Sequence, residues 1–518
     1  MQRLTISWAT IGPVLFTTLA ILAISHLKQP PVQAVFAISL VLLVATRKTA
    51  TPHPLKIRPA LVVFTLISAA FFTLTCVTVI FGKTTLAAFM YHLKLGTAGY
   101  GYGYAMSIAP LFVAVWLFMM AAVVRMLKHN PAGKNLLWGI SLVYLLASPL
   151  APYARDYIRF QLGANAATPM PDLAQIYTPP EPENRPAPAK NLIIIYLEGL
   201  ERTYGQSSVF ADAYKPLADL EKQAVVFTNI AQLSNTGWTI AGMSASQCGV
   251  PLVTPGLWAP NGLRGNTAFL PDAVCLGDLL SARGYSQTFL LGSKSAFARK
   301  DLFYKTHGFD SIIGKEDLTQ VAPDDRNGWG LYDDDLFAVT KARLAKLESR
   351  KTPYNMVLLT VGPHGYTPFV AGSCTEEGRG FVSDNILDAV ACTGRLTRDF
   401  IRDIRDIVDM DNTLIVVMSD HLTHENNMTP VLEGMERRNT VMMLGAGLAA
   451  QRIDKAGAMI DVYPTILQAL GYDLPEDRAG LGVSLFSDRP TLVEQYGVDT
   501  LDTAIMYDDR LARRLWGE

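Results

Sequence analysis

Five long apolar stretches dominate the first 155 residues. They run over 6–27, 32–46, 60–82, 104–124 and 136–153, and each except the short second one is close to the roughly 20 residues that a helix needs to cross a bilayer. Basic residues gather between the second and third stretches and between the fourth and fifth, which places those loops in the cytoplasm. The pattern predicts five transmembrane helices, with the rest of the chain outside the cytoplasm. A cleaved signal peptide is the alternative for the first stretch.

The pattern changes after residue 155. Residues 155–162 predict a short amphipathic helix on the membrane surface, and seven prolines between Pro169 and Pro188 predict an extended, semi-rigid connector. We therefore assign 1–155 to a transmembrane region and 156–189 to a juxtamembrane helix and linker. A tail over 489–518 contains an amphipathic stretch, 501–516, which either packs on the preceding domain or rests on the membrane.

Residues 190–488 alternate short apolar runs with helical patterns. The apolar runs include 191–196, 285–291, 354–361 and 413–418, and 393–408 is typical of a helix. Continuous apolar strands separated by helices are typical of a parallel sheet that is covered on both faces. The expected fold class is an N-terminal five-helix transmembrane region followed by an α/β domain with a mostly parallel sheet.

The predicted membrane part and the rest of the chain also differ in charge. Only 18% of the 518 residues are charged, below the ~25% of average soluble domains, and the formal net charge is -1. Residues 1–155 hold twelve Lys and Arg and no acidic residue, whereas the remainder holds 33 basic and 46 acidic residues. The acidic outer part argues against nucleic-acid binding. The lack of acidic residues in the spans argues against a transporter, although a ligand-binding sensor stays open as an alternative.

Four cysteines lie outside the predicted spans, and Cys76 lies within one. An even number in a compartment that permits oxidation indicates two disulfides, and four cysteines allow three pairings. The shortest loops favour Cys248 with Cys275 and Cys374 with Cys392.

Residues suited to catalysis follow two of the predicted strands. Glu198 comes after 191–197, and Asp420 and His421 come after 413–418. Ligands bind at the carboxyl ends of such strands, and this set of two carboxylates and one imidazole suits Mn, Zn or Mg. Segment 234–248 is typical of a loop that leads into a helix of small residues, where the hydroxyl of Thr236 or Thr239 is either a helix cap or a nucleophile.

Together these residues resemble the lipoteichoic acid synthase and phosphoethanolamine transferase branch of the alkaline phosphatase/sulfatase superfamily. Within that branch the chain resembles the phosphoglycerol transferase I family, which modifies osmoregulated periplasmic glucans. The resemblance covers about 190–475. Its motifs are Leu200–Tyr204, Thr239–Met243, Ser246–Gly249, Cys275–Asp278, Lys305–Asp310 and Trp329–Asp333.

The resemblance implies a role for each matching residue. Thr236 becomes the nucleophile, and its oxygen joins Glu198, Asp420 and His421 as ligands of one divalent metal ion. His364 becomes the residue that contacts the phosphoryl group or the leaving oxygen. Further substrate contacts fall on Lys300 and Asp301, in place of an Arg-Asp pair, and on Arg299, Trp329 and His424.

The activity that the resemblance implies is transfer of the sn-glycerol-1-phosphate headgroup of phosphatidylglycerol onto a periplasmic glucan or other glycan. A covalent phosphothreonine would be the intermediate, and Mn would be the metal, with Zn or Mg as alternatives. The enzyme would be a multi-pass inner-membrane protein whose catalytic domain faces the periplasm. Phosphoethanolamine transfer to lipid A or a glycan is one alternative. A phosphodiesterase or sulfatase-like hydrolase is another, against which a Thr nucleophile in place of Cys or Ser counts.

Overall fold

The computed structural model divides the chain into two compact units. One comprises 1–86 and 101–164, and the other comprises 87–100 and 165–518. The residues that the structure describes are 59–81, 91, 103–129, 134–148, 151, 170–181, 189–253, 267–365, 367–507 and 510–517.

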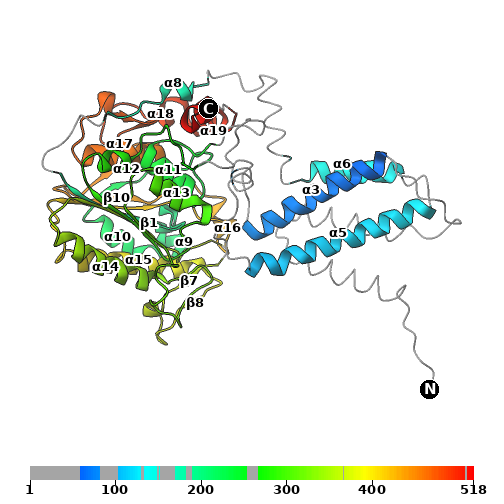
Figure 1. Cartoon of the computed structure of the whole chain (residues 1–518), viewed down its shortest axis with the longest axis horizontal. Helices are drawn as coiled ribbons and strands as arrows, with labels where there is room; N and C mark the ends of the chain where they lie inside the picture. Colours follow the sequence, from blue (N-terminus) through cyan, green and yellow to red (C-terminus); the bar gives the residue numbers. More distant parts are fainter. Residues whose placement is uncertain are drawn as a thin grey trace. The chain divides into compact units, whose positions relative to one another are not determined.

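The first unit contains three apolar helices: α3 (Pro59–Phe81), α5 (Gly103–His129) and α6 (Lys134–Leu146) (Figure 1). Among the described residues, one helix is long and apolar enough to cross a membrane, over Pro59–Thr78, and shorter apolar helices cover Ala109–Arg125 and Asn135–Leu146. Three of the five predicted spans are therefore helical. The first two spans and the surface helix predicted over 155–162 lie outside the described residues.

An eight-stranded sheet forms the centre of the second unit, in the order β11-β2-β10-β9-β1-β6-β4-β5. Strand β10 is antiparallel to both of its neighbours, and the other pairs in this sheet are parallel, so the sheet is mixed. The strands are β1 (Asn191–Leu197), β2 (Val225–Phe227), β4 (Ser286–Leu291), β5 (Ser311–Ile313), β6 (Tyr354–Leu359), β9 (Thr413–Ser419), β10 (Val441–Gly445) and β11 (Gln451–Ile453).

Helices cover both faces of this sheet (Figure 1). Alternate side chains of β1 enter two different cores, and all seven of its residues are buried, which explains its continuous apolar sequence. One core includes α11 (Thr239–Cys248), α12 (Leu276–Ser281) and α17 (Met459–Ala469); the other includes α10 (Lys215–Glu221), α14 (Asp333–Glu348) and α15 (Ile386–Ile404). The predicted α/β class is confirmed for this unit.

Shorter elements complete the second unit. The helices are α8 (Leu173–Ile176), α9 (Ser207–Phe210), α13 (Lys300–Thr306), α16 (Thr429–Leu432), α18 (Leu492–Tyr496), α19 (Val498–Tyr507) and α20 (Arg510–Trp516). Three strand pairs lie outside the main sheet: β3 (Ile230–Ala231) with β12 (Gly457–Ala458), β7 (Phe369–Val370) with β8 (Phe381–Val382), and β13 (Arg478–Ala479) with β14 (Gly482–Val483).

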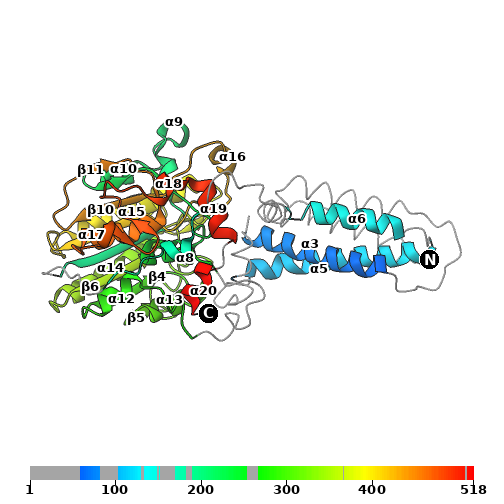
Figure 2. The same cartoon turned by 90° about the horizontal axis from the view of Figure 1, so that it is seen from above.

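The tail packs on the rest of the second unit, which is one of the two arrangements expected for it. Figure 2 shows α8 beside α20, and Arg510 forms an ion pair of 2.8 Å with Asp172 near the start of α8. The Trp516 indole donates a hydrogen bond to the Val253 carbonyl at 2.8 Å. Leu511, Leu515 and Trp516 are buried in the same core as α11 and α17.

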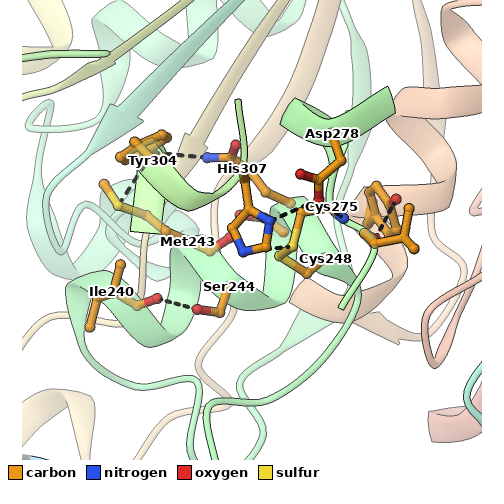
Figure 3. The surroundings of a disulfide bond; sticks show 12 residues. Ile240, Met243, Ser244, Cys248, Cys275, Asp278, Tyr304 and His307 are labelled. Atoms are coloured by element: carbon orange, nitrogen blue, oxygen red, sulfur yellow. Dashed lines mark hydrogen bonds and ion pairs between the residues drawn. A yellow bond between two sulfur atoms is a disulfide. The ribbon is translucent and has the colours of Figure 1, made fainter. Parts of the chain in front are cut away.

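Both predicted disulfides are present, Cys248–Cys275 and Cys374–Cys392. The first joins the last residue of α11 to the N-cap of α12. In Figure 3, His307 lies between this disulfide and Asp278, with Nδ1 2.8 Å from the Asp278 carboxylate and Nε2 3.5 Å from the Cys275 sulfur. Because the Cys248 and Cys275 sulfurs are bonded to each other, this disulfide has a structural role: it links α11 covalently to α12.

Candidate active site

Sheet register brings the predicted metal ligands together. Strands β1 and β9 are parallel neighbours, and Leu197 pairs with Ser419 at their carboxyl ends. The next residues of the two strands, Glu198 and Asp420, therefore leave the same edge side by side, and His421 follows. One ligand atom from each of these three buried residues lies within 4.8 Å of the others.

The three side chains fit a divalent cation. The His421 Nδ1 lies 2.7 Å from the Leu422 carbonyl and so carries the hydrogen, which leaves Nε2 to face the carboxylates. This Nε2 is 3.2 Å from Glu198 Oε1 and 3.3 Å from Asp420 Oδ2. Among the described residues, His421 Nε2 and Asp420 Oδ2 are buried polar atoms without a well-formed hydrogen bond. Buried polar atoms of this kind could ligate a cation, and an oxygen, oxygen, nitrogen set suits Mn, Zn or Mg.

Electrostatics in the cluster point the same way. Burial and the neighbouring Glu198 charge raise the pKa of Asp420 to about 7. Burial opposes the charged form of Glu198, but the contact with His421 outweighs it and lowers the pKa of Glu198. Burial also opposes the charged form of His421, but the charge of Asp420 and the contact with Glu198 outweigh it and raise the pKa of His421 to about 9. The Glu198 and Asp420 carboxylates are buried close together, so nearby positive charge stabilises their ionised forms. A bound cation would supply such a charge.

The structure brings Thr239, and not Thr236, to this cluster. Thr239 is the first residue of α11, and its hydroxyl donates to Glu198 Oε2 at 3.3 Å. The Thr236 side chain is only 1% exposed, and its hydroxyl donates to the Leu233 carbonyl at 2.8 Å. The geometry therefore favours Thr239 over Thr236 as the nucleophile, because the turn before α11 directs the Thr236 hydroxyl back to its own backbone.

Close packing between α11 and the end of β9 holds Thr239 in place. A Cβ atom on Gly242 would lie 1.7 Å from the Asp420 carbonyl oxygen, far inside contact distance. Only glycine therefore lets α11 approach the ligand-bearing turn so closely. This glycine lies in the Thr239–Met243 motif.

His364 lies in the turn that follows β6, the other neighbour of β1. Its ring centroid is 4.9 Å from that of Trp329, which in turn is 5.2 Å from that of Phe297. Burial lowers the pKa of His364, and the charge of Glu198 opposes this only in part. The predicted substrate residues His364 and Trp329 thus contact each other, and burial favours the neutral form of His364.

Asp333 holds the His364 turn, and sequence reasoning missed its role. Its carboxylate accepts hydrogen bonds from the Val361 and Gly362 amides at 2.7 and 3.0 Å and from the Thr393 hydroxyl at 2.7 Å. Burial raises its pKa to about 6. The available signal was an acidic residue at the end of the motif Trp329–Asp333.

Glu201 and Arg437 support the loop after β9, and sequence reasoning missed this role as well. Glu201 is fully buried and pairs with Arg437 at 2.9 Å, and Arg437 also donates to the Thr423 carbonyl at 2.8 Å. The ring of His424, a predicted substrate residue, lies 4.4 Å from that of His421. Because Arg437 binds between His421 and His424, it fixes the path of the loop that carries both.

Lys300 and Asp301 begin α13, beyond the carboxyl end of β4. The Lys300 side chain is buried, and its amine donates to the Phe297 carbonyl at 2.9 Å. Burial lowers the pKa of Lys300 to about 8, opposed by the charges of Glu198 and Asp420. Asp301 Oδ1 is another buried atom without a hydrogen bond among the described residues. Arg299 precedes them as the half-buried, left-handed N-cap of α13.

Comparison with known proteins agrees with this architecture. The family model described as Sulfatase matches residues 190–472. Phosphoglycerol transferase I of Citrobacter koseri is 33% identical over 400 residues, which are 75% of this chain and 50% of the relative, and that of Escherichia fergusonii is 32% identical over the same shares. The chain thus spans about half the length of the curated relatives it matches.

Solved structures with a similar fold have lower sequence identity. A protein of the alkaline phosphatase superfamily from Vibrio parahaemolyticus has a TM-score of 0.48 and 20% identity, covering 63% of this chain and 77% of that one. The lipoteichoic acid synthase LtaP from Listeria monocytogenes has a TM-score of 0.44 and 17% identity, covering 63% and 81%. The family model alone matches more than half of the residues, and the chain belongs to the sulfatase family.

Proposed function

We propose that this chain is a membrane-anchored phosphoglycerol transferase with Thr239 as its nucleophile. The donor would be phosphatidylglycerol, and the acceptor a periplasmic glucan or other glycan. The observation that carries the proposal is the Thr239 hydroxyl, 3.3 Å from Glu198 in a buried cluster whose other members are Asp420 and His421. Similarity to enzymes named phosphoglycerol transferase I supports the choice of headgroup.

A divalent cation held by Glu198, Asp420 and His421, with Mn first and Zn or Mg as alternatives, would supply positive charge that favours ionisation of a hydroxyl and neutralises a phosphodiester. Glu198 accepts the hydrogen bond of the Thr239 hydroxyl and so orients this oxygen. In the first step, a bond forms between the Thr239 oxygen and phosphorus. The bond from phosphorus to the diacylglycerol oxygen breaks, and the proton that this oxygen takes up balances the one that the Thr239 hydroxyl loses.

The second step regenerates Thr239. A glycan hydroxyl attacks phosphorus, its oxygen replaces the Thr239 oxygen, and the proton it loses balances the one that Thr239 regains. Burial favours the neutral form of His364, and we assign this residue hydrogen bonds to the phosphoryl or leaving oxygen. Lys300 and Asp301 would contact the donor lipid, Lys300 as a positive charge and Asp301 as a hydrogen-bond acceptor. These contacts form the donor side of the site. Arg299, Trp329 and His424 are proposed as further substrate contacts.

We also propose that the catalytic unit lies outside the cytoplasm, on a multi-pass inner-membrane protein that faces the periplasm. The apolar helix α3, the basic loops expected in the cytoplasm and two disulfides support this arrangement. Tyr91 adds a further argument. It lies between α3 and α5, yet it is buried in the catalytic unit, as required if α3 and α5 both cross the membrane and their connection is on the catalytic side.

Peptide mass spectrometry on the full chain tests the proposal. After incubation with Mn and phosphatidylglycerol, we expect a glycerophosphoryl adduct that fragment ions place on Thr239. It should persist in Thr236→Ala and be absent from Thr239→Ala. An adduct on Thr236, or none in folded, metal-loaded protein, would overturn the covalent assignment. A phosphoethanolamine adduct that forms only with phosphatidylethanolamine would overturn the headgroup assignment.

A further inference from the structure

Tyr91 is a residue of the catalytic unit that comes from the sequence between the apolar helices α3 and α5. Its side chain is fully buried, and its hydroxyl donates to the Ala298 carbonyl at 2.6 Å, across 207 residues of sequence. Its ring centroid lies 6.3 Å from those of Trp238 and Phe269. Two of these partners, Ala298 and Trp238, lie just before α13 and α11, the helices that begin with Lys300 and Thr239.

The backbone that receives this hydrogen bond has an unusual conformation. Ala298 and Arg299 have φ values of 56° and 58°, the left-handed region that residues with side chains disfavour. Two such residues in succession persist only where surrounding contacts hold them. The bond from Tyr91 to the Ala298 carbonyl is one such contact, and it also satisfies a buried acceptor.

This strained turn leads directly into the donor side of the site. Lys300 and Asp301 follow Arg299 as the first residues of α13, and Lys300 donates back to the Phe297 carbonyl. The other ring neighbour of Tyr91, Trp238, is the N-cap of α11 and precedes Thr239. One side chain therefore contacts both the turn before Lys300 and the residue before the nucleophile.

We propose that Tyr91 is a positioning residue of this active site: it holds the Ala298–Arg299 turn and so places Lys300 and Asp301 against the phosphate of the donor lipid. What these two residues bind rests on the proposed function, but the placement itself does not. The sequence between two apolar helices then forms part of the site that acts on a lipid.

The first test is Tyr91→Phe in the full chain, with phosphatidylglycerol as donor. Loss of the hydroxyl should raise the donor KM about five- to tenfold and change kcat less than about twofold, since the lost hydrogen bond acts on donor binding. Tyr285→Phe is the matched control. Tyr285 donates to the Lys190 carbonyl at the same 2.6 Å and lies in the same core, so its loss tests general destabilisation. Equal KM values for the two variants would overturn the proposal.

A second measurement does not depend on activity. Hydrogen–deuterium exchange of the 297–306 peptide should become faster in Tyr91→Phe and stay unchanged in Tyr285→Phe. In an Ala298→Gly background, where the left-handed conformation costs less, Tyr91→Phe should affect KM less than twofold. Unchanged exchange in Tyr91→Phe overturns the positioning role whatever the donor is. Faster exchange in a protein that transfers nothing from phosphatidylglycerol supports the positioning role and rejects the proposed donor.

Discussion

The two sides of the active site are built in different ways. The cluster of Glu198, Asp420 and His421 follows two paired strands directly, so the sheet register fixes it. The donor side, with Lys300 and His364, lies on longer connections after β4 and β6 and depends on separate supports such as Asp333 and the Phe297 carbonyl. The proposed metal ligands are thus placed on the sheet edge, whereas the proposed substrate contacts are placed on longer connections.

The proposed nucleophile, Thr239, gives the sharpest test of this comparison, because its hydroxyl contacts Glu198 in the cluster. Thr239→Ala should reduce transfer at least about 10³-fold, since no other described hydroxyl contacts Glu198 in this way. Thr236→Ala should cost less than about tenfold, because that hydroxyl only bonds the Leu233 carbonyl. Steady-state transfer assays on folded protein measure both. The reverse order of the two effects would return the nucleophile to Thr236.

The next test moves α11 away from the sheet edge. Gly242→Ala places a methyl group where the Asp420 carbonyl lies, so the helix must shift. We expect transfer to fall roughly 10- to 100-fold and the free energy of unfolding to fall by about 1–3 kcal/mol. Kinetics and chemical denaturation measure these changes.

Gly394→Ala is the control for this substitution, because Gly394 also lies within a helix, and its added Cβ would approach the Leu217 side chain at 3.3 Å. This flexible neighbour can move, so stability should change by less than ~1 kcal/mol. Full transfer activity in Gly242→Ala would show that the close approach of α11 is dispensable.

On the donor side, the expected effect depends on pH. Burial lowers the pKa of Lys300 to about 8, so its amine is charged at pH 7 and loses its charge as the pH rises through 8. The donor KM should therefore rise about tenfold between pH 7 and pH 9.5. Lys300→Arg should flatten this rise, because a guanidinium stays charged. A rise of equal size in Lys300→Arg would assign the titration to another group.

The smallest effect on activity is expected from the Cys374–Cys392 disulfide. It closes a loop with a sequence separation of 18, and replacing both cysteines by Ser should lower the free energy of unfolding by roughly 3 kcal/mol. Transfer at 25 °C should change less than threefold, since the Asp333 carboxylate keeps its two backbone donors near His364. Denaturant titration and kinetics of the double variant separate the two quantities. A large loss of transfer would show that this disulfide supports the His364 turn.

The same contrast explains what the sequence could predict. Apolar runs identify β1 and β9, and the residues after them are the cluster, because neighbouring parallel strands end at one edge. Thr239 was considered only as an alternative, since two hydroxyls three residues apart look alike until the turn before α11 is known. Tyr91 had no local signal at all, because its role depends on a contact 207 residues away.

The tail also sets when the site can form during synthesis. Asp502 accepts a hydrogen bond from the Ser234 amide, 268 residues earlier, and Trp516 donates to Val253, 263 residues earlier. Both partners flank the segment that carries Thr239. At about 5–20 residues per second, roughly 15–50 s pass between synthesis of that segment and of its supports. Thr239 is therefore synthesised long before the tail contacts on either side of its segment, and these contacts form only as the last described helices fold.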